Sequence, residues 1–550
     1  MKIFLLTLVL LLQLSCAFAN VSIMPVRDIE PGMHGIGKTV IEGDTVEEFG
    51  VEVIGVNGRE TTGQSILVRL YGDLIEKTRG VAQGMSGSPV YIDGRIVGAV
   101  AFGKTFNDPH YCFLTPIGDM LRLLDEPRGE KDNWIPKSTP LVASGFTSFG
   151  LEYLNEQLKP FGLDALPAGS TDFESAKDLE PGSSVGVSLM HGDMSLGALG
   201  TVTWVGDDGK ILAFGHPFMA RGDSNFYMNR VWILGCIPNM QSSYKVGNLG
   251  APIGKIVEDR ASGIAGEIGK APQAIPLFVS ATDNGRGLST SIRTGIVKDD
   301  KLLTAMVDAA TVNTVSKTLN RAGGGTARVH FTIDGKDADK NLLRIDRENM
   351  YYSNDSVLKT ITQELTDATN TLMQNKFADV DVYGINVEAE VSDDVKVAEI
   401  TAVKALEDKV KVGSKLPIKV TMKPYRGEEF TKVYHYEIAK DQKLGKLNLN
   451  VRGGSSMAWV IKLLRKQKED DMPAAKKKEK KRTLKDYVDD VNKSDKNNEL
   501  IVDIASGGPK DQETEGGLAA MLKGSRFKQR FPHDFIIDGE KDITVTVIGE

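Results

Sequence analysis

Hydrophobic and polar residues alternate along much of the chain, which predicts a mainly β protein. Residues 65–70 have the character of one strand. Residues 90–100 form two β-rich runs joined by Asp93-Gly94, a dipeptide typical of two-residue hairpin turns. The amino-terminal part of the chain therefore contains closely spaced strands with tight turns between them.

The second half of the chain has a different pattern. Apolar residues recur at helical spacing in 302–319 and again between 357 and 372, so we expect 301–385 to be an α+β segment. Residues 386–450 alternate between turns and predict a small immunoglobulin-like β-sandwich.

The sequence at 84–89, Gly-Met-Ser-Gly-Ser-Pro, stands just before the predicted hairpin. Glycine on either side of Ser86 permits backbone conformations that are closed to other residues. The amides of Gly84 and Ser86 can then point into one small volume and form an oxyanion hole. A tight glycine turn with a solvent-exposed serine explains the same residues, so the motif is a hypothesis until its partners are found.

A partner for Ser86 is available among the seven histidines of the chain. His216 follows an apolar strand and stands between Gly215 and Pro217, where a rigid scaffold would place a functional side chain. A structural histidine that caps a turn is the alternative. His110, in a polar loop, is a weaker candidate.

Residues 83–89, together with 98–100 and 107–109, resemble the serine region of the SpoIVB (stage IV sporulation protein B) serine peptidase family. Residues 199–203, followed by Gly215-His216, are similar to the histidine region of that family. The resemblance spans residues 25–270. It implies a chymotrypsin-like double β-barrel in which Ser86 is the nucleophile and His216 the general base.

The order of the two residues departs from the family pattern. In sporulation protein B the histidine precedes the serine, whereas here Ser86 precedes His216. This order is similar to that of exported bacterial proteins that carry the domain in permuted form. It permits catalysis, because a triad is defined by its geometry and not by chain order.

The resemblance also implies a third catalytic residue, since the family has an aspartate shortly before the serine. The nearest match is Asp73. Asp108 and Asp223 are alternatives, although an Asn-Asp-Pro turn explains Asp108 without catalysis. A carboxylate in this role would hold the second ring nitrogen of the histidine.

Two internal similarities suggest related half-domains. Residues 29–37 resemble 179–187, and residues 87–100 resemble 200–215. Two barrels of common design with a site between them would explain both similarities, and two unrelated pairs of turns are the alternative.

The chain therefore divides into eight segments. They are a signal peptide (1–19), the serine-bearing half of the peptidase-like region (20–130), a connector (131–180), the histidine-bearing half (181–300), the α+β segment (301–385), the β-sandwich (386–450), a charged linker (451–482) and a C-terminal segment (483–550). Because the 531 residues that follow the signal peptide (550 minus 19) are too many for one core, three or four domains are expected.

Residues 1–19 have the form of a secretory signal, with Lys2, an apolar run and the cleavage site Ala17-Phe18-Ala19. We expect a mature chain that begins at Asn20 and lies outside the cytoplasm, in the periplasm, in the cell envelope or secreted. In an oxidising compartment the mature cysteines, Cys112 and Cys236, can form a disulfide; two free buried thiols are the alternative.

Composition excludes several classes of function. The formal net charge of −7 argues against nonspecific binding of nucleic acid. The sequence has no Walker loop, dinucleotide fingerprint or zinc-type cluster, so no cofactor or metal is expected. After the signal, no stretch is long and apolar enough to span a membrane.

Two hypotheses from different classes follow. The first is an exported serine endopeptidase or self-processing protein, whose substrate is a protein or peptide, its own chain included. The second is a catalytically silent cell-envelope scaffold or binding protein that keeps a peptidase-like barrel and works through its β-sandwich.

Overall fold

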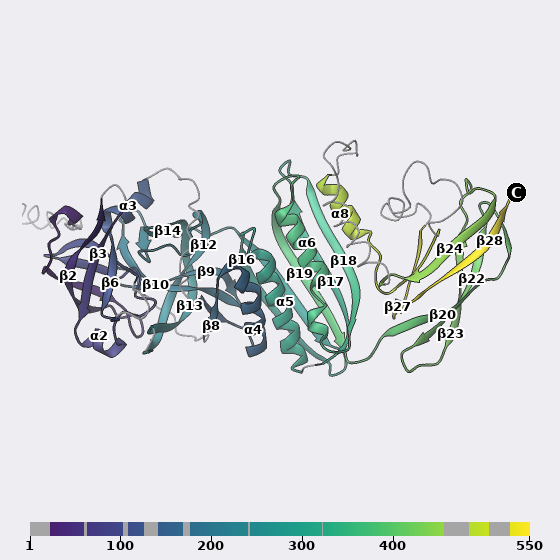
Figure 1. Cartoon of the computed structure of the whole chain (residues 1–550), viewed down its shortest axis with the longest axis horizontal. Coiled ribbons are helices and arrows are strands. Elements are labelled where there is room, and N and C mark those ends of the chain that lie inside the picture. Colours follow the sequence, from purple (N-terminus) through teal and green to yellow (C-terminus); the bar gives the residue numbers. More distant parts are fainter. Residues whose placement is uncertain are drawn as a thin grey trace, which may run out of the picture. The chain divides into compact units, whose positions relative to one another are not determined.

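A computed structural model describes residues 22–59, 63–102, 108–125, 141–168, 177–239, 242–321, 323–455, 483–504 and 528–549. The expected signal peptide and almost all of the expected charged linker lie outside these residues. The described residues form two compact units, one of 22–274 with 294–298 and the other of 275–293 with 299–549. Figure 1 shows the chain coloured along its sequence.

The first unit begins with a closed six-stranded barrel. Its strands, in order around the barrel, are β1 (His34–Thr39), β2 (Glu47–Arg59), β3 (Gly63–Tyr71), β6 (Tyr111–Pro116), β5 (Arg95–Phe102) and β4 (Pro89–Ile92). Alternate residues point inward and are fully buried, as in Val51 and Val53 of β2 and Ile66, Val68 and Leu70 of β3. Helices α2 (Asp73–Thr78) and α3 (Ile117–Asp125) follow β3 and β6.

A second ring of six strands follows in the same unit. Its strands are β9 (Ser184–Gly192), β10 (Ser195–Val205), β11 (Lys210–Ala213), β14 (Gly263–Ile268), β13 (Tyr244–Arg260) and β12 (Gly222–Ile237), each paired with the next, and β12 pairs back with β9. Numbered by chain order within each barrel, both rings read 1-2-3-6-5-4. The mainly β, double-barrel fold predicted from the sequence is therefore confirmed.

Short elements extend the second barrel. β10 also pairs with β7 (Leu141–Ser144), and β7 pairs with β8 (Ala165–Pro167). Helix α4 (Ser148–Leu158) lies between β7 and β8 in the chain, within the expected connector. Residues 294–296 of β16 (Leu288–Val297) pair with residues 190–192 of β9, beyond the part of β9 that pairs with β12.

The common strand order explains only one of the two internal similarities. Residues 29–37 lead into β1 and 179–187 lead into β9, which are the first strands of the two barrels. Residues 87–100 form the fourth and fifth strands of their barrel, whereas 200–215 hold the second and third. The second similarity therefore compares two hairpins at different positions in the fold.

The β12–β13 hairpin joins the two barrels. Gly43 exchanges two backbone hydrogen bonds with Ile233, of 2.7 and 3.0 Å. Gln83 donates its N–H to Ser243 O (2.7 Å) and accepts the N–H of Lys245 (2.9 Å). Residues of the second barrel thus reach the segment that precedes Ser86.

The second unit begins with a β-sheet and two helices. The strands lie in the order β18 (Leu342–Ser353), β17 (Gly325–Lys336), β19 (Asp381–Ser392), β15 (Ala274–Asp283) and the first part of β16. Helices α5 (Leu303–Leu319) and α6 (Gln363–Gln374) pack against each other, and α5 also contacts β19 (Figure 1). Both predicted helices are therefore present, and the segment is α+β.

The rest of the second unit is a β-sandwich. One sheet has the order β23 (Phe430–Glu437), β22 (Lys415–Pro424), β20 (Val397–Ala405) and β27 (Ile536–Asp538). The other has the order β21 (Lys409–Lys411), β28 (Glu540–Ile548), β24 (Gly445–Gly453), β25 (Glu499–Ile504) and β26 (Gln529–Pro532). Both sheets contribute to one apolar core.

The sandwich is larger than the predicted span of 386–450. It gains β25–β28 from the C-terminal segment, whereas β19 pairs with β15 and β17 and not with the sandwich. Alternation identifies a half-buried strand but does not specify its partners, so the sequence could not place β19. Between β24 and β25 the chain also forms helix α8 (Leu484–Asn492), which packs on β18.

Candidate active site

Ser86 lies in a turn between α2 and β4, flanked by two glycines with left-handed backbone. The φ angles are +91° at Gly84 and +94° at Gly87, values that L side chains rarely adopt. A Cβ at Gly87 would overlap the carbonyl oxygen of Thr201 and lie 2.5 Å from the backbone nitrogen of Phe214. The side chain of Met85 is fully buried in the first barrel and anchors the turn.

The hydrogen bonds of this turn single out two amides. The N–H groups of Gln83, Met85, Gly87 and Ser88 donate to backbone carbonyls over 2.7 to 3.0 Å. Within the described residues, the N–H groups of Gly84 and Ser86 make no hydrogen bond. These are the two amides that the sequence predicted as an oxyanion hole. The turn therefore presents two unpaired donors, on the serine and two residues before it.

Strand β10 of the second barrel donates three hydrogen bonds to the turn that carries Ser86. The N–H of Thr201 donates to Ser86 O (2.9 Å), and its hydroxyl donates to Gly84 O (2.9 Å). The hydroxyl of Thr203 donates to Gly87 O (2.8 Å). Three carbonyls of the serine turn are thus fixed by two threonines, so the turn belongs structurally to both barrels.

His216 follows β11, and its neighbour Gly215 lies against the strand that Ser86 contacts. A Cβ at Gly215 would be 2.9 Å from Val100 O and 3.5 Å from the Cα of Ala101. The Ser86 hydroxyl donates to Ala101 O over 3.3 Å. The structure therefore brings both segments to residues 100–101 of β5, although no hydrogen bond joins the Ser86 hydroxyl to the His216 ring.

The hydrogen bond of the His216 ring fixes its tautomer. Nδ1 lies 2.8 Å from Pro217 O, and a carbonyl only accepts hydrogen bonds, so Nδ1 carries the proton. Nε2 is then the nitrogen with the lone pair. Burial lowers the pKa of His216, with the bond to Pro217 acting in the opposite direction. The ring is therefore neutral at pH 7, as a general base must be.

Asp259, on β13, is a site residue that the sequence analysis missed. Its carboxylate is fully buried and accepts the backbone N–H groups of Phe218, Met219 and Arg221, in the loop that follows His216. Burial raises the pKa of Asp259 to about 6, against the effect of these three hydrogen bonds.

Lys245, also on β13, was missed as well. Its buried ammonium donates to the hydroxyls of Thr39 (2.9 Å) and Thr201 (3.3 Å), and its aliphatic chain covers Gly84. Burial lowers the pKa of Lys245 to about 7, while the nearby Cys236 acts weakly in the opposite direction. A buried amine behind the serine turn therefore titrates near neutral pH.

The free energy of unfolding should rise with pH because of Lys245. The ordinary pKa of lysine is 10.5, so between pH 7 and 10 the unfolded chain binds more protons than the folded one. The rise reaches up to about 1.4 kcal/mol per pH unit. Lys245→Met should remove this part of the rise, and Lys255→Met, on the same strand, should retain it. Urea unfolding at pH 7 and 9 measures both; equal pH dependence in Lys245→Met and wild type would contradict the account.

The candidate carboxylates do not contact the His216 ring. Asp73 is exposed at the start of α2, and Asp223 is exposed on β12. Asp108 accepts the backbone N–H of His110 (3.0 Å) and bonds its ring (2.7 Å), contacts that lower the pKa of Asp108. The hydrogen-bond partner of His216 Nδ1 is the carbonyl oxygen of Pro217 instead. The role implied for Asp73 stays a prediction.

The two mature cysteines are free thiols in the structure. Cys112 is buried in the core of the first barrel, and the partly buried Cys236 packs against the same core. Burial raises the pKa of Cys112 to about 12, which keeps it protonated. Whether the two thiols are oxidised to a bridge in an oxidising compartment stays a prediction.

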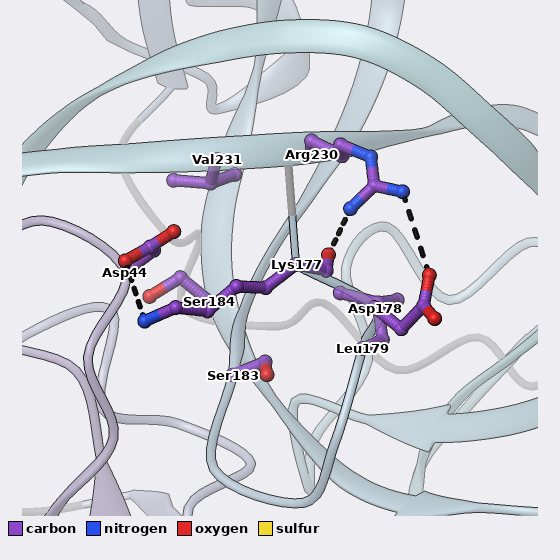
Figure 2. Close-up of a pocket in the computed structure, with 8 residues that line it drawn as sticks. All are labelled: Asp44, Lys177, Asp178, Leu179, Ser183, Ser184, Arg230 and Val231. Carbon is purple, nitrogen blue, oxygen red and sulfur yellow. Dashed lines mark hydrogen bonds and ion pairs between the residues drawn. The ribbon is translucent and has the colours of Figure 1, made fainter. Parts of the chain in front are cut away.

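A pocket lies beside the start of β9 (Figure 2). Its lining residues are Asp44, Lys177, Asp178, Leu179, Ser183, Ser184, Arg230 and Val231. Lys177 pairs with Asp44 (2.9 Å), and Arg230 contacts Asp178 and the Lys177 carbonyl. None of the predicted catalytic residues lines this pocket, and its cations are already paired, so we assign it no catalytic role.

Residues 13–121 match the family SpoIVB peptidase S55. The match contains the whole first barrel, Ser86, both unpaired amides and Asp73, and it ends before His216. The resemblance to SpoIVB peptidases is therefore confirmed for the serine-bearing half. No curated protein and no solved structure matches the chain.

Within the described part of the chain, no group of three or more His, Cys, Asp or Glu residues could hold a metal ion. Among its helices, none is both long enough and apolar enough to cross a membrane.

Proposed function

We propose that this protein is a serine endopeptidase of the SpoIVB type, with Ser86 as nucleophile and His216 as general base. The observation that carries the proposal is the pair of unpaired N–H groups at Gly84 and Ser86, in the region matched by SpoIVB peptidase S55. Two converging donors stabilise the oxyanion of acyl transfer, and leaving them unpaired in a well-bonded turn otherwise has a cost.

The proposed reaction has two stages. The Ser86 hydroxyl attacks the peptide carbonyl carbon while its proton passes to Nε2 of His216, and the oxyanion accepts hydrogen bonds from Gly84 and Ser86. The C–N bond breaks as His216 returns the proton to the amine. Water, deprotonated by His216, then hydrolyses the acyl ester and frees Ser86.

We propose that a rotation of the Ser86 side chain precedes this reaction. The Ser86 hydroxyl donates to Ala101 O, so it must leave this carbonyl before it can donate to Nε2 of His216. Catalytic hydrogen bonds are commonly long or misaligned before substrate binds, and a χ1 change of this kind is fast. A substrate carbonyl at the two free amides would favour the turned rotamer.

We also propose that the protein acts outside the cytoplasm on a protein or peptide, its own chain included. The signal-like residues 1–19 support export. The alternative is a silent scaffold with a peptidase-like barrel. The observation that favours it is the bond from Ser86 to Ala101, which leaves serine and histidine uncoupled.

Incubation of the purified chain 20–550 tests the proposal. Fragments of the chain itself or of added β-casein should accumulate with wild type and be absent with Ser86→Ala. Ser88→Ala is the matched control, because the Ser88 hydroxyl lies in the same turn but is buried and donates to Met85 O. Equal fragmentation by wild type and Ser86→Ala, or none by either, would favour the scaffold.

The third catalytic residue has a test of its own. The family resemblance predicts that Asp73→Asn lowers hydrolysis by about 10⁴-fold, the loss typical of a triad carboxylate replaced by its amide. The bond from Nδ1 to Pro217 O predicts instead that Asp73→Asn changes the rate little. The hydrolysis rates of Asp73→Asn, Asp108→Asn and Asp223→Asn should be compared with that of wild type. A large loss in one of them would show that a carboxylate holds Nδ1 of His216 during catalysis, and no loss in any would show that the Pro217 carbonyl does.

A further inference from the structure

The loop after His216 is organised around one buried carboxylate. Asp259 Oδ1 accepts the N–H of Phe218 (2.7 Å), and Oδ2 accepts those of Met219 (2.7 Å) and Arg221 (3.2 Å). Asp259 is 0 % exposed and lies 38 to 41 residues away in the chain from the three donors. Three main-chain groups of a five-residue loop thus depend on a single distant side chain.

The loop needs this carboxylate to keep its conformation. Ala220 has a left-handed φ of +54°, which is strained for a residue with a side chain. Phe218 is 2 % exposed and packs edge-on against Phe214 and Phe226, with ring centroids 6.5 and 5.6 Å apart. Without Asp259, the buried N–H of Phe218 would lose its partner, which costs free energy.

The same loop holds the base. Pro217, whose carbonyl accepts the Nδ1 proton of His216, is bonded directly to Phe218, the first residue held by Asp259. Fixing the N–H of Phe218 orients the peptide plane between Pro217 and Phe218, and with it the carbonyl of Pro217. The position of that carbonyl therefore follows from the position of Asp259.

We propose that Asp259 is the positioning residue of His216: it orients the Pro217 carbonyl, which holds the Nδ1 proton and leaves Nε2 as the base. The inference rests on the proposed function for its catalytic consequence. In a standard triad a carboxylate contacts the ring itself. Here the carboxylate acts through one peptide group.

Asp259→Asn tests the inference, because it keeps the size of the side chain but replaces one acceptor oxygen with a donor NH₂. Two readouts are needed. The ¹⁵N chemical shifts of the His216 ring should change from a single Nδ1–H tautomer to a mixture of tautomers. The maximal rate of Ser86 labelling by a fluorophosphonate should fall about 100-fold, the typical cost of misplacing a catalytic group, while the half-saturating concentration stays unchanged.

Glu258→Gln is the matched control. Glu258 is the preceding residue on β13 and nearly as buried, but it pairs with Arg260 and not with the loop. Glu258→Gln should leave both the tautomer and the labelling rate as in wild type. If Glu258→Gln changes them as much as Asp259→Asn does, the effect belongs to strand β13 in general and the inference fails.

The outcomes separate this inference from the proposed function. A mixture of tautomers in Asp259→Asn supports positioning even if wild type labels no serine, in which case the proposed function alone fails. If Asp259→Asn folds and its His216 ring still has a single Nδ1–H tautomer, the inference is wrong, whatever the rate at which Ser86 is labelled.

A second measurement applies if Asp259→Asn does not fold. In wild type, the amide protons of Phe218, Met219 and Arg221 should shift together as Asp259 is protonated, and the Nδ1 proton of His216 should show a step at the same midpoint. A step at that midpoint in the Nδ1 signal supports the inference. An Nδ1 signal that does not respond there overturns it.

Discussion

Peptide hydrolysis by the His216→Ala chain is expected to be about 10⁶-fold slower than by wild type, the loss seen when the base of a serine triad is removed. The His216 ring is neutral and protonated at Nδ1, and the neighbouring Gly215 lies against residues 100–101 of β5, which Ser86 also contacts. The proposed reaction uses His216 in both proton transfers. Without it, Ser86 keeps its proton at neutral pH and attacks poorly.

The pH dependence of peptide hydrolysis by the wild-type chain provides a second test of His216 as the general base. Because burial lowers the pKa of His216 from 6.5, the neutral base predominates at pH 7, and the rate should rise with pH to a plateau reached by that point. His110→Ala is the control and should keep both the rate and the rise, since the His110 ring pairs with Asp108 and makes no hydrogen bond to Ser86. A rate unchanged in His216→Ala would exclude it as the base.

Gly87→Ala is expected to destabilise the first unit by at least about 3 kcal/mol. Two effects add: the left-handed φ of +94°, and the overlap of the new Cβ with the main chain of Thr201 and Phe214. These are backbone atoms of β10 and of the turn before His216, so they cannot move aside as a side chain would. Peptide hydrolysis should be lost as well.

Gly94→Ala separates these two effects. Gly94 has a left-handed φ of +73°, but a Cβ there would meet no atom within 4 Å. It should cost only about 1 kcal/mol, from backbone strain alone. Urea unfolding of the two variants gives the difference. Equal midpoints would show that the serine turn does not pack against the second barrel as described.

The sequence predicted a mainly β protein because the strands carry their own signals, and it predicted two barrels because residues 25–270 resemble the SpoIVB peptidases. Alternation and tight turns identify strands such as β3, β4 and β5 locally. Which strands pair is decided by contacts distant in the chain, so the 1-2-3-6-5-4 order and the place of β19 came only from the structure. The predicted boundary of the sandwich was wrong for the same reason.

In the predicted site too, residues with a local sequence signal could be predicted, and residues that act through distant contacts could not. Glycines around Ser86 and the Gly-His-Pro sequence at His216 have local causes, namely left-handed turns, and could be recognised. Asp259 could not, because charged neighbours on both sides make its segment resemble a solvent-exposed strand end. Its partners are main-chain groups, which no sequence motif records. Lys245 was hidden similarly among polar residues of β13.

Labelling by a biotinylated fluorophosphonate, followed by peptide mapping, tests directly whether Ser86 is an activated nucleophile. A fluorophosphonate reacts with a serine hydroxyl only where a base and an oxyanion hole activate it. We expect one label per folded chain, on Ser86, and its loss in Ser86→Ala, in His216→Ala and after unfolding in urea. A folded wild-type chain that takes up no label, or takes it up on another serine, would show that Ser86 is not the nucleophile.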